Sequence, residues 1–216
     1  MQAKPEQPTI ILATSNGVGM GHLARATAIG LALKNRANPI IISMASAVAE
    51  IPEATGIPAE YITGRDRGLM SRYKWDKYLK DRILALVEET GATILTFDGV
   101  VPYPGILAAK MAKPELTLIW IRRGLWQKKP QRFVLGAQSK IMDYVIEPGD
   151  YARAYDKGPT SKRKESKLVS PVSLFKESSV LNKKAAKEKL GLNSNYKYLL
   201  FFGLIRKYKG LDILIK

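Results

Sequence analysis

Short apolar segments rich in Ile, Leu and Val alternate along most of the chain with longer segments of helical period. Strands that are apolar on both faces and are separated by helices are typical of a parallel sheet covered on both sides. We therefore predict a doubly wound α/β fold with a Rossmann-like parallel sheet. The strand segments are TIILATS (9–15), PIIISMA (39–45), ATILTF (92–97), LTLIWI (116–121) and DYVIE (143–147).

Four predicted helices lie between these strands. Apolar residues at helical spacing mark 21–36 and 73–90, and Gly91 is a natural C-terminal cap for the second of these helices. Two more helices are expected at 104–113 and 131–139.

The pattern changes after residue 155. The segment DKGPTSKRKESK (156–167) has no large apolar residue, which indicates a solvated loop. We expect one domain at 1–174 and, at 175–216, a linker helix and the truncated start of a second domain. The elements expected beyond the loop are a short strand with a turn at 168–174, a helix at 183–192, a strand at 197–203 and a helix from about Tyr208.

Composition narrows the class of protein. The chain has 216 residues, enough for a sizeable core, and no cysteine, which excludes disulfides and thiolate metal sites. The polar N-terminus lacks the apolar region of a signal peptide, and no apolar run approaches the ~18 residues that span a bilayer, so we expect a cytoplasmic chain. A net charge of +16 implies an anionic partner. We expect no metal and no cofactor.

A glycine-rich turn follows the first strand. Gly17, Gly19 and Gly21 precede a helix whose free N–H groups and positive dipole end favour an anion, usually phosphate. The dinucleotide fingerprint is met only in a weak form, and the second strand ends without the carboxylate that binds ribose, which disfavours an NAD(P) enzyme. No Gly-Lys-Ser/Thr follows the glycines, so this turn is not a P-loop.

His22, the only histidine of the chain, lies in the first turn of this helix. The helix dipole disfavours its protonated ring there, so a neutral imidazole could accept a proton as a general base. The alternative is a histidine that only packs or hydrogen-bonds near the helix start. The surrounding glycines favour the first interpretation.

The segment TSNGVGMGHLARATAIGLAL (14–33) resembles the N-terminal motif of the GT-B glycosyltransferases. The similarity is to the branch that includes the peptidoglycan N-acetylglucosaminyltransferase and the UDP-glycosyltransferases. It extends through FDGVVPYPGI (97–106) and IWIRRGLW (119–126), and covers most of 8–174. The resemblance implies two Rossmann-like domains that face each other, with the N-terminal one binding the acceptor and the C-terminal one the nucleotide-sugar donor.

The tail carries a second resemblance. YLLFFGLIRKYKGLDILIK (198–216) is similar to the start of the C-terminal domain in the glycogen-synthase-like group of glycosyltransferases. This resemblance implies that Arg206 and Lys209 hold the donor diphosphate, with Gly203 and Gly210 shaping the loop. In that group the arginine usually follows the first glycine directly, where this chain has Leu204. The first branch mostly inverts and the second mostly retains the sugar's configuration, so the stereochemistry stays open.

Other candidates lie at the carboxyl ends of predicted strands, where open α/β sheets bind ligands. Asp98 could orient His22 and stabilise its protonated form. Arg122 and Arg123 could bind an acceptor phosphate. Glu147 also ends a strand, but a loop or cap role is the favoured interpretation for it. The alternative for each of the others is likewise a structural role.

Two basic segments, RRGLWQKKPQR (122–132) and SKRKESK (161–167), have a composition suited to an anionic membrane surface. A lipid-linked acceptor and peripheral contact with the inner face of the membrane would fit them, although ordinary solubilising surface has the same composition. A basic nucleotide- or nucleic-acid-binding module without catalysis is the rival class, and no nucleic-acid-binding motif is visible in the sequence to support it.

The sequence therefore predicts a glycosyltransferase-type chain that transfers a sugar from a nucleotide-sugar donor to a carbohydrate, lipid-linked or small-molecule acceptor. Because the donor domain is expected to be incomplete, we expect the chain to be inactive alone. The sugar, the nucleotide and the acceptor are not readable from the residues.

Overall fold

The computed structural model describes residues 7–15, 20–65, 69–124, 132–150, 152–161, 164–175, 177–201 and 210–215. The chain divides into two compact units, Met1–Ser173 and Leu174–Lys216.

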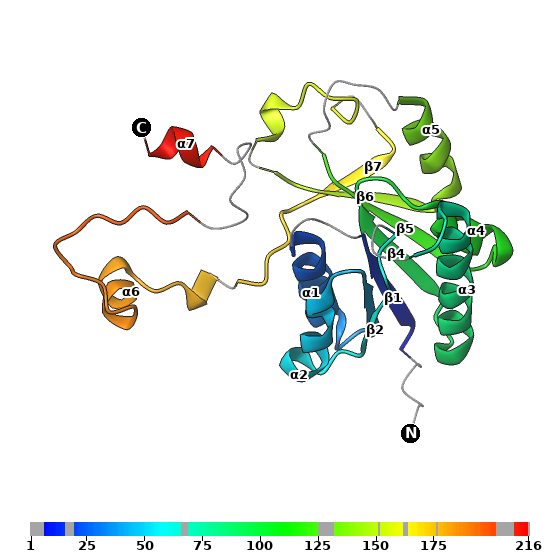
Figure 1. Cartoon of the computed structure of the whole chain (residues 1–216), viewed down its shortest axis with the longest axis horizontal. Helices are drawn as coiled ribbons and strands as arrows, with labels where there is room; N and C mark the ends of the chain where they lie inside the picture. Colours follow the sequence, from blue (N-terminus) through cyan, green and yellow to red (C-terminus); the bar gives the residue numbers. More distant parts are fainter. Residues whose placement is uncertain are drawn as a thin grey trace. The chain divides into compact units, whose positions relative to one another are not determined.

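The first unit is built on a seven-stranded sheet in the order β3-β2-β1-β4-β5-β6-β7 (Figure 1). Every neighbouring pair of strands is parallel. The doubly wound, Rossmann-like α/β fold predicted from the sequence is thus confirmed. The strands are β1 (Thr9–Thr14), β2 (Asn38–Ser43), β3 (Ala59–Tyr61), β4 (Ile94–Gly99), β5 (Thr117–Arg122), β6 (Tyr144–Pro148) and β7 (Ser166–Val169).

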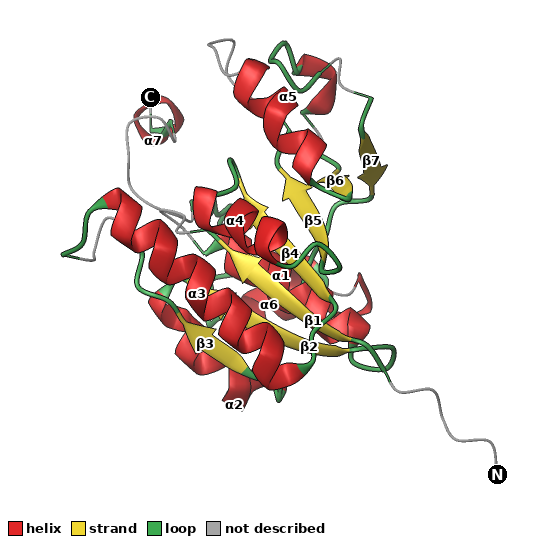
Figure 2. Cartoon of the chain, turned by 90° about the vertical axis from the view of Figure 1, so that its right-hand side faces the viewer, coloured by secondary structure: helices red, strands yellow, loops and turns green. Residues whose placement is uncertain are grey.

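Helices lie on both faces of this sheet. Figure 2 shows α3 and α4 in front of the strands, with α1 and α2 on the opposite face. Two short 3₁₀ helices, η1 (Ser46–Glu50) and η2 (Arg153–Tyr155), complete the unit. The α-helices are α1 (Gly21–Leu33), α2 (Ile51–Thr55), α3 (Arg72–Thr90), α4 (Pro104–Ala112) and α5 (Arg132–Ile141).

The longest helix, α3, shows how local signals and packing agree. The Ser71 side chain caps its first turn by accepting from the Lys74 N–H, and Gly91 ends it in the left-handed conformation at φ 66°. Its apolar stripe, which includes the fully buried Trp75 and Ile83, belongs to the larger core cluster of the sheet.

Helix α4 packs directly on α3 through Gly105. A Cβ added at Gly105 would lie 2.5 Å from the Asp76 carbonyl oxygen, closer than real Cβ atoms approach. The Gly105 N–H also donates to Asp76 Oδ1 at 3.2 Å. Glycine is therefore required here by the close approach of the two helices.

The order of the predicted elements in this unit is confirmed, with shifts at their ends. β7 begins at Ser166, inside the segment expected to be a loop, because its pairing with β6 uses backbone groups and needs no apolar side chain. The described residues just before it, 156–161 and 164–165, have no helix or strand, as expected. The short elements α2 and β3 were not predicted.

The described part of the second unit has little packed structure. It contains η3 (Glu177–Ser179), α6 (Lys183–Lys189) and α7 (Leu211–Leu214). The strand expected at 197–203 is wrong for the described part, 197–201, which is irregular. A strand needs a hydrogen-bonded neighbour, and the described residues of this unit offer none, so Leu199 and Leu200 stay more than 80% exposed.

Candidate functional site

The strand order reverses beside β1, which has β2 on one side and β4 on the other. In open α/β sheets, ligands bind at such a switch point, outside the carboxyl ends of the strands. His22 lies in the first turn of α1, the helix that follows β1, and Asp98 lies at the carboxyl end of β4. The sheet topology therefore brings together two residues that are 76 positions apart.

His22 and Asp98 are in direct contact. His22 Nδ1 lies 2.7 Å from Asp98 Oδ1, and the Asp98 side chain is 1% exposed while that of His22 is 18% exposed. A carboxylate can only accept hydrogen bonds, so in this contact Nδ1 carries the proton. The other ring nitrogen, Nε2, is then free of a proton in the neutral ring and can accept one.

Arg25 completes this cluster and was not among the sequence-predicted site residues. Its Nε donates to Asp98 Oδ2 at 2.6 Å and its Nη2 donates to Oδ1 at 2.7 Å, a bidentate ion pair. The same Nη2 lies 3.3 Å from His22 Nδ1. The only sequence signal was its position three residues after His22, which places both on one face of the helix.

The backbone around Asp98 is held by both neighbouring strands. The Ser15 N–H donates to the Asp98 carbonyl at 2.8 Å, and Trp120 Nε1–H donates to the Gly99 carbonyl at 3.0 Å. A Cβ added at Gly99 would lie 2.8 Å from the Ser15 Cβ and 2.6 Å from the Phe97 ring. The end of β4 is therefore fixed, and Asp98 with it.

The glycine turn is only partly described. Gly17 and Gly19 lie outside the described residues. Gly21 opens α1, and a Cβ built there would meet no atom of the described residues within 4 Å. The first turn of α1 has no acidic residue and no side-chain cap, so no side chain in this turn offsets the positive end of the helix dipole.

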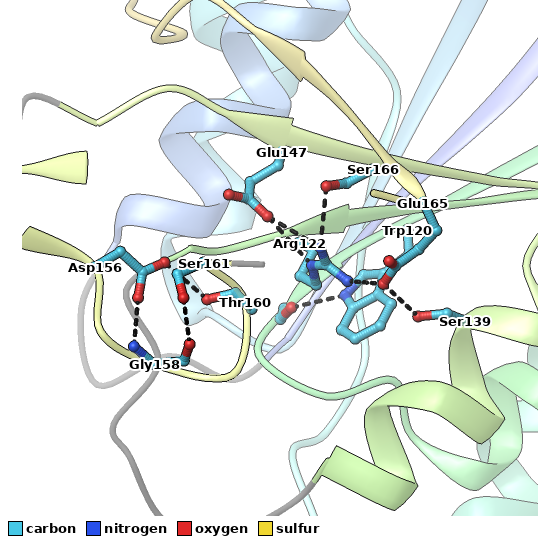
Figure 3. A network of polar contacts seen from close by, with 11 residues as sticks. Trp120, Arg122, Ser139, Glu147, Asp156, Gly158, Thr160, Ser161, Glu165 and Ser166 are labelled. Atoms are coloured by element: carbon cyan, nitrogen blue, oxygen red, sulfur yellow. Dashed lines mark hydrogen bonds and ion pairs between the residues drawn. The ribbon is translucent and has the colours of Figure 1, made fainter. Parts of the chain in front are cut away.

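The structure places Arg122 in a second cluster, at the carboxyl ends of β5 and β6 (Figure 3). Arg122 is 0% exposed; its Nη2 lies 3.1 Å from Glu147 Oε2, and its Nη1 donates to Glu165 Oε1 at 2.6 Å. Nη2 also donates to Ser166 Oγ at 3.0 Å, and the guanidinium lies 5.6 Å from the centre of the Trp120 ring. Arg122 thus binds two carboxylates of its own chain.

The structure describes only two of the remaining predicted residues, Arg123 and Gly210. Arg123 is exposed at the end of β5. Gly210 precedes α7 in the second unit with φ 72°. Gly203, Arg206 and Lys209 lie outside the described residues.

Two kinds of feature were sought in the part of the chain that the structure describes, a metal-binding group and a membrane-spanning helix. This part of the chain contains no group of three or more His, Cys, Asp or Glu side chains placed to hold a metal ion. None of its helices is both long and apolar enough to cross a membrane.

Comparison with known proteins rests on structure alone. No protein-family model matches the chain, and no curated protein matches it in sequence. A glycosyltransferase from Rickettsia africae ESF-5 has a similar structure, with a TM-score of 0.66 and 14% identity over 88% of this chain and 51% of that one. MurG from Acinetobacter baumannii is also similar in structure, with a TM-score of 0.54 and 15% identity over 86% of this chain and 54% of that one.

A third similar structure is a UDP-N-acetylglucosamine 2-epimerase, with a TM-score of 0.50 and 11% identity over 76% of this chain and 48% of that one. The chain spans about half the length of these structures. At such low identities the likeness concerns the fold. The chain therefore has a GT-B glycosyltransferase-like fold.

Proposed function

We propose that this chain is the acceptor-side module of a glycosyltransferase that uses a nucleotide-sugar donor. The observation that carries the proposal is the His22–Asp98 contact at the switch point of a sheet whose fold is shared with glycosyltransferases. A histidine with an orienting carboxylate at a ligand-binding edge is suited to general base catalysis.

In the proposed reaction, His22 Nε2 takes the proton of an acceptor hydroxyl. The hydroxyl oxygen forms a bond to the anomeric carbon of the donor sugar, and the bond from that carbon to the nucleoside diphosphate breaks, so the diphosphate leaves with the bonding electrons. Asp98 accepts from Nδ1–H throughout and stabilises the imidazolium that forms.

Phosphate groups are proposed to bind at the glycine turn and the N-terminus of α1. Among the described residues, no atom lies within 4 Å of the place where a Gly21 side chain would stand, and the free N–H groups of a helix start suit an anion. Arg123 is a further candidate for an acceptor phosphate. Arg122 would have to leave Glu147 and Glu165 to play that part, which makes it the weaker candidate.

The donor diphosphate is proposed to bind Arg206 and Lys209, with Gly203 and Gly210 shaping the loop. Among the described residues of Leu174–Lys216 no side chain is buried. The described part of this unit therefore offers no enclosed pocket for a base, a ribose and a sugar. We propose that the 216-residue chain alone binds nucleotide sugars no better than in the millimolar range and has no appreciable transfer activity.

A cytoplasmic location and peripheral contact with an anionic membrane, through the basic segments 122–132 and 161–167, remain part of the proposal. The charge of these segments is the support for the membrane contact.

The test measures the binding of nucleotide sugars. The purified chain is dialysed against labelled nucleotide sugars, with UDP-N-acetylglucosamine first, and Gly21→Val is compared with it. We expect weak, saturable binding that Gly21→Val abolishes while the unfolding free energy changes by less than about 1 kcal/mol, because Gly and Val have similar helix propensities. Tight binding of nucleic acid, with none of nucleotide sugars, would favour the rival class.

A further inference from the structure

Asp98 differs from a carboxylate that serves a histidine alone, because it binds two side chains of α1 at once. We propose that Arg25 is a positioning residue that keeps His22 in its proton-accepting form. The consequence of this role for catalysis rests on the proposed function. The protonation of the His22 ring, which Arg25 controls, can be observed in the protein without ligand.

The guanidinium fork of Arg25 sets the geometry of the cluster. It covers both oxygens of Asp98, with contacts of 2.6 Å to Oδ2 and 2.7 Å to Oδ1. A bidentate guanidinium fixes the plane of the carboxylate, which a single hydrogen bond does not. Since Oδ1 also receives His22 Nδ1–H, fixing that plane also fixes the direction of the imidazole ring.

The positive charge of Arg25 matters as much as its shape. Asp98 is 1% exposed, and a buried carboxylate without a counter-charge is costly. Arg25 supplies that charge, so Asp98 can stay ionised beside a neutral ring. Among the described residues, no Lys or other Arg side chain forms an ion pair with Asp98.

Loss of Arg25 would change the protonation of the pair. Without this cation the buried charge of Asp98 favours one additional proton on the His22–Asp98 pair, in one of two places. On His22 it makes an imidazolium; on Asp98 it makes a hydroxyl that donates to Nδ1 and reverses the tautomer. Both outcomes leave Nε2 protonated, and a protonated Nε2 cannot act as a base.

His22 is the only histidine of the chain, so its two ring nitrogens can be observed without assignment problems by nitrogen-15 NMR. The experiment compares the wild-type chain with Arg25→Met, which removes the charge at similar length, and Arg25→Lys, which keeps the charge without the fork. At neutral pH we expect Nδ1–H with unprotonated Nε2 in the wild type. We expect a protonated Nε2 in Arg25→Met and at least partial return of the unprotonated form in Arg25→Lys.

Arg82→Met is the matched control. Arg82 also forms a bidentate pair, with both contacts to Glu60 at 2.6 Å, and its other ion-pair partner is Glu89, so its charge serves neither His22 nor Asp98. This variant should leave the His22 signals unchanged. The Trp120 Nε1–H signal, which depends on the contact with Gly99, reports whether β4 and β5 remain folded.

An unprotonated Nε2 in folded Arg25→Met, as in the wild type, would overturn the proposal. If Arg25→Met does not fold, Arg25→Gln, which keeps a donor without charge, takes its place and must show the same protonated Nε2. This result does not depend on sugar transfer. If the ring states are as expected but His22 has no effect on catalysis, the proposed general base is wrong and the positioning role of Arg25 still holds.

Discussion

Two arginine–carboxylate clusters lie at the same edge of the sheet, one at the end of β4 and the other at the ends of β5 and β6, and they differ in access to solvent. In the first, Arg25 and His22 are about one-fifth exposed around a buried Asp98. In the second, Arg122 is completely buried and binds Glu147 and Glu165. Only the first contains a histidine, the side chain suited to proton exchange near neutral pH.

This difference separates a candidate reactive site from a structural one. A ligand can reach His22 without breaking an internal ion pair, whereas a ligand of Arg122 must displace two carboxylates. The second cluster also links β5 to β6 and to the start of β7. We therefore expect changes in the first cluster to affect function and changes in the second to affect stability.

The largest expected effect is on catalysis. In a form of the protein that transfers sugar, for example one joined to a complete donor domain, His22→Ala should lower turnover by roughly two to four powers of ten, the usual contribution of general acid–base catalysis. Steady-state transfer of a labelled sugar measures this, and urea unfolding should show stability near that of the parent. A loss below about threefold would mean that His22 has no role as a base.

The next effect is on stability. Arg122→Met leaves the buried Glu147 without its cation, and breaking a buried pair in this way costs about 3–5 kcal/mol. Urea unfolding monitored by circular dichroism measures the loss. Glu165→Gln is the control, because Glu165 is about one-third exposed and its loss leaves Arg122 paired with Glu147. Equal, small effects of both variants would contradict a structural role for this cluster.

The smallest expected effect concerns Asp143, which precedes β6 at the opposite edge of the sheet. Partial burial opposes its ionisation, but hydrogen bonds from Lys110 and from the Leu118 N–H outweigh this and hold the pKa of Asp143 below its usual value. Its stabilising contribution is therefore present above the ordinary pKa of about 3.9 and is lost as the pH falls through the lower folded-state value.

Because the Lys110 and Asp143 side chains are both partly exposed, we expect this ion pair to contribute less than about 1 kcal/mol to the free energy of unfolding. Unfolding free energies of the wild type and Asp143→Asn, measured from about pH 6 down to about pH 2, should converge toward the acid end. A constant difference between them over that range would show that the charge of Asp143 contributes nothing.

The sequence predicted the sheet well because its strands are buried on both faces. Such strands read as continuous apolar runs, as TIILATS does for Thr9–Thr14. The same reading failed at 197–201, because an apolar run becomes a strand only where a partner strand is present, and the described residues of the second unit supply none.

The candidate site was only partly predictable. The glycine-rich turn before the first predicted helix indicated His22, and the edge rule for parallel strands indicated Asp98. Neither signal could indicate Arg25, because an arginine within a helix is expected to be solvent-exposed unless the residue that faces it is known. Glu165 was missed because its partner, Arg122, lies 43 positions away in sequence, at the end of β5.

The most direct test of the proposed site locates the residues at which a phosphate-bearing ligand binds. The nitrogen-15-labelled chain is titrated with UDP-N-acetylglucosamine and a panel of other nucleotide sugars, and the signals of the His22 ring, the Gly21 amide and the Arg122 Nε–H are followed. We predict saturable shifts at His22 and Gly21 in the millimolar range, with Arg122 unchanged. Shifts at Arg122 with none at His22 would contradict the assignment of the reactive site to the switch point beside β1.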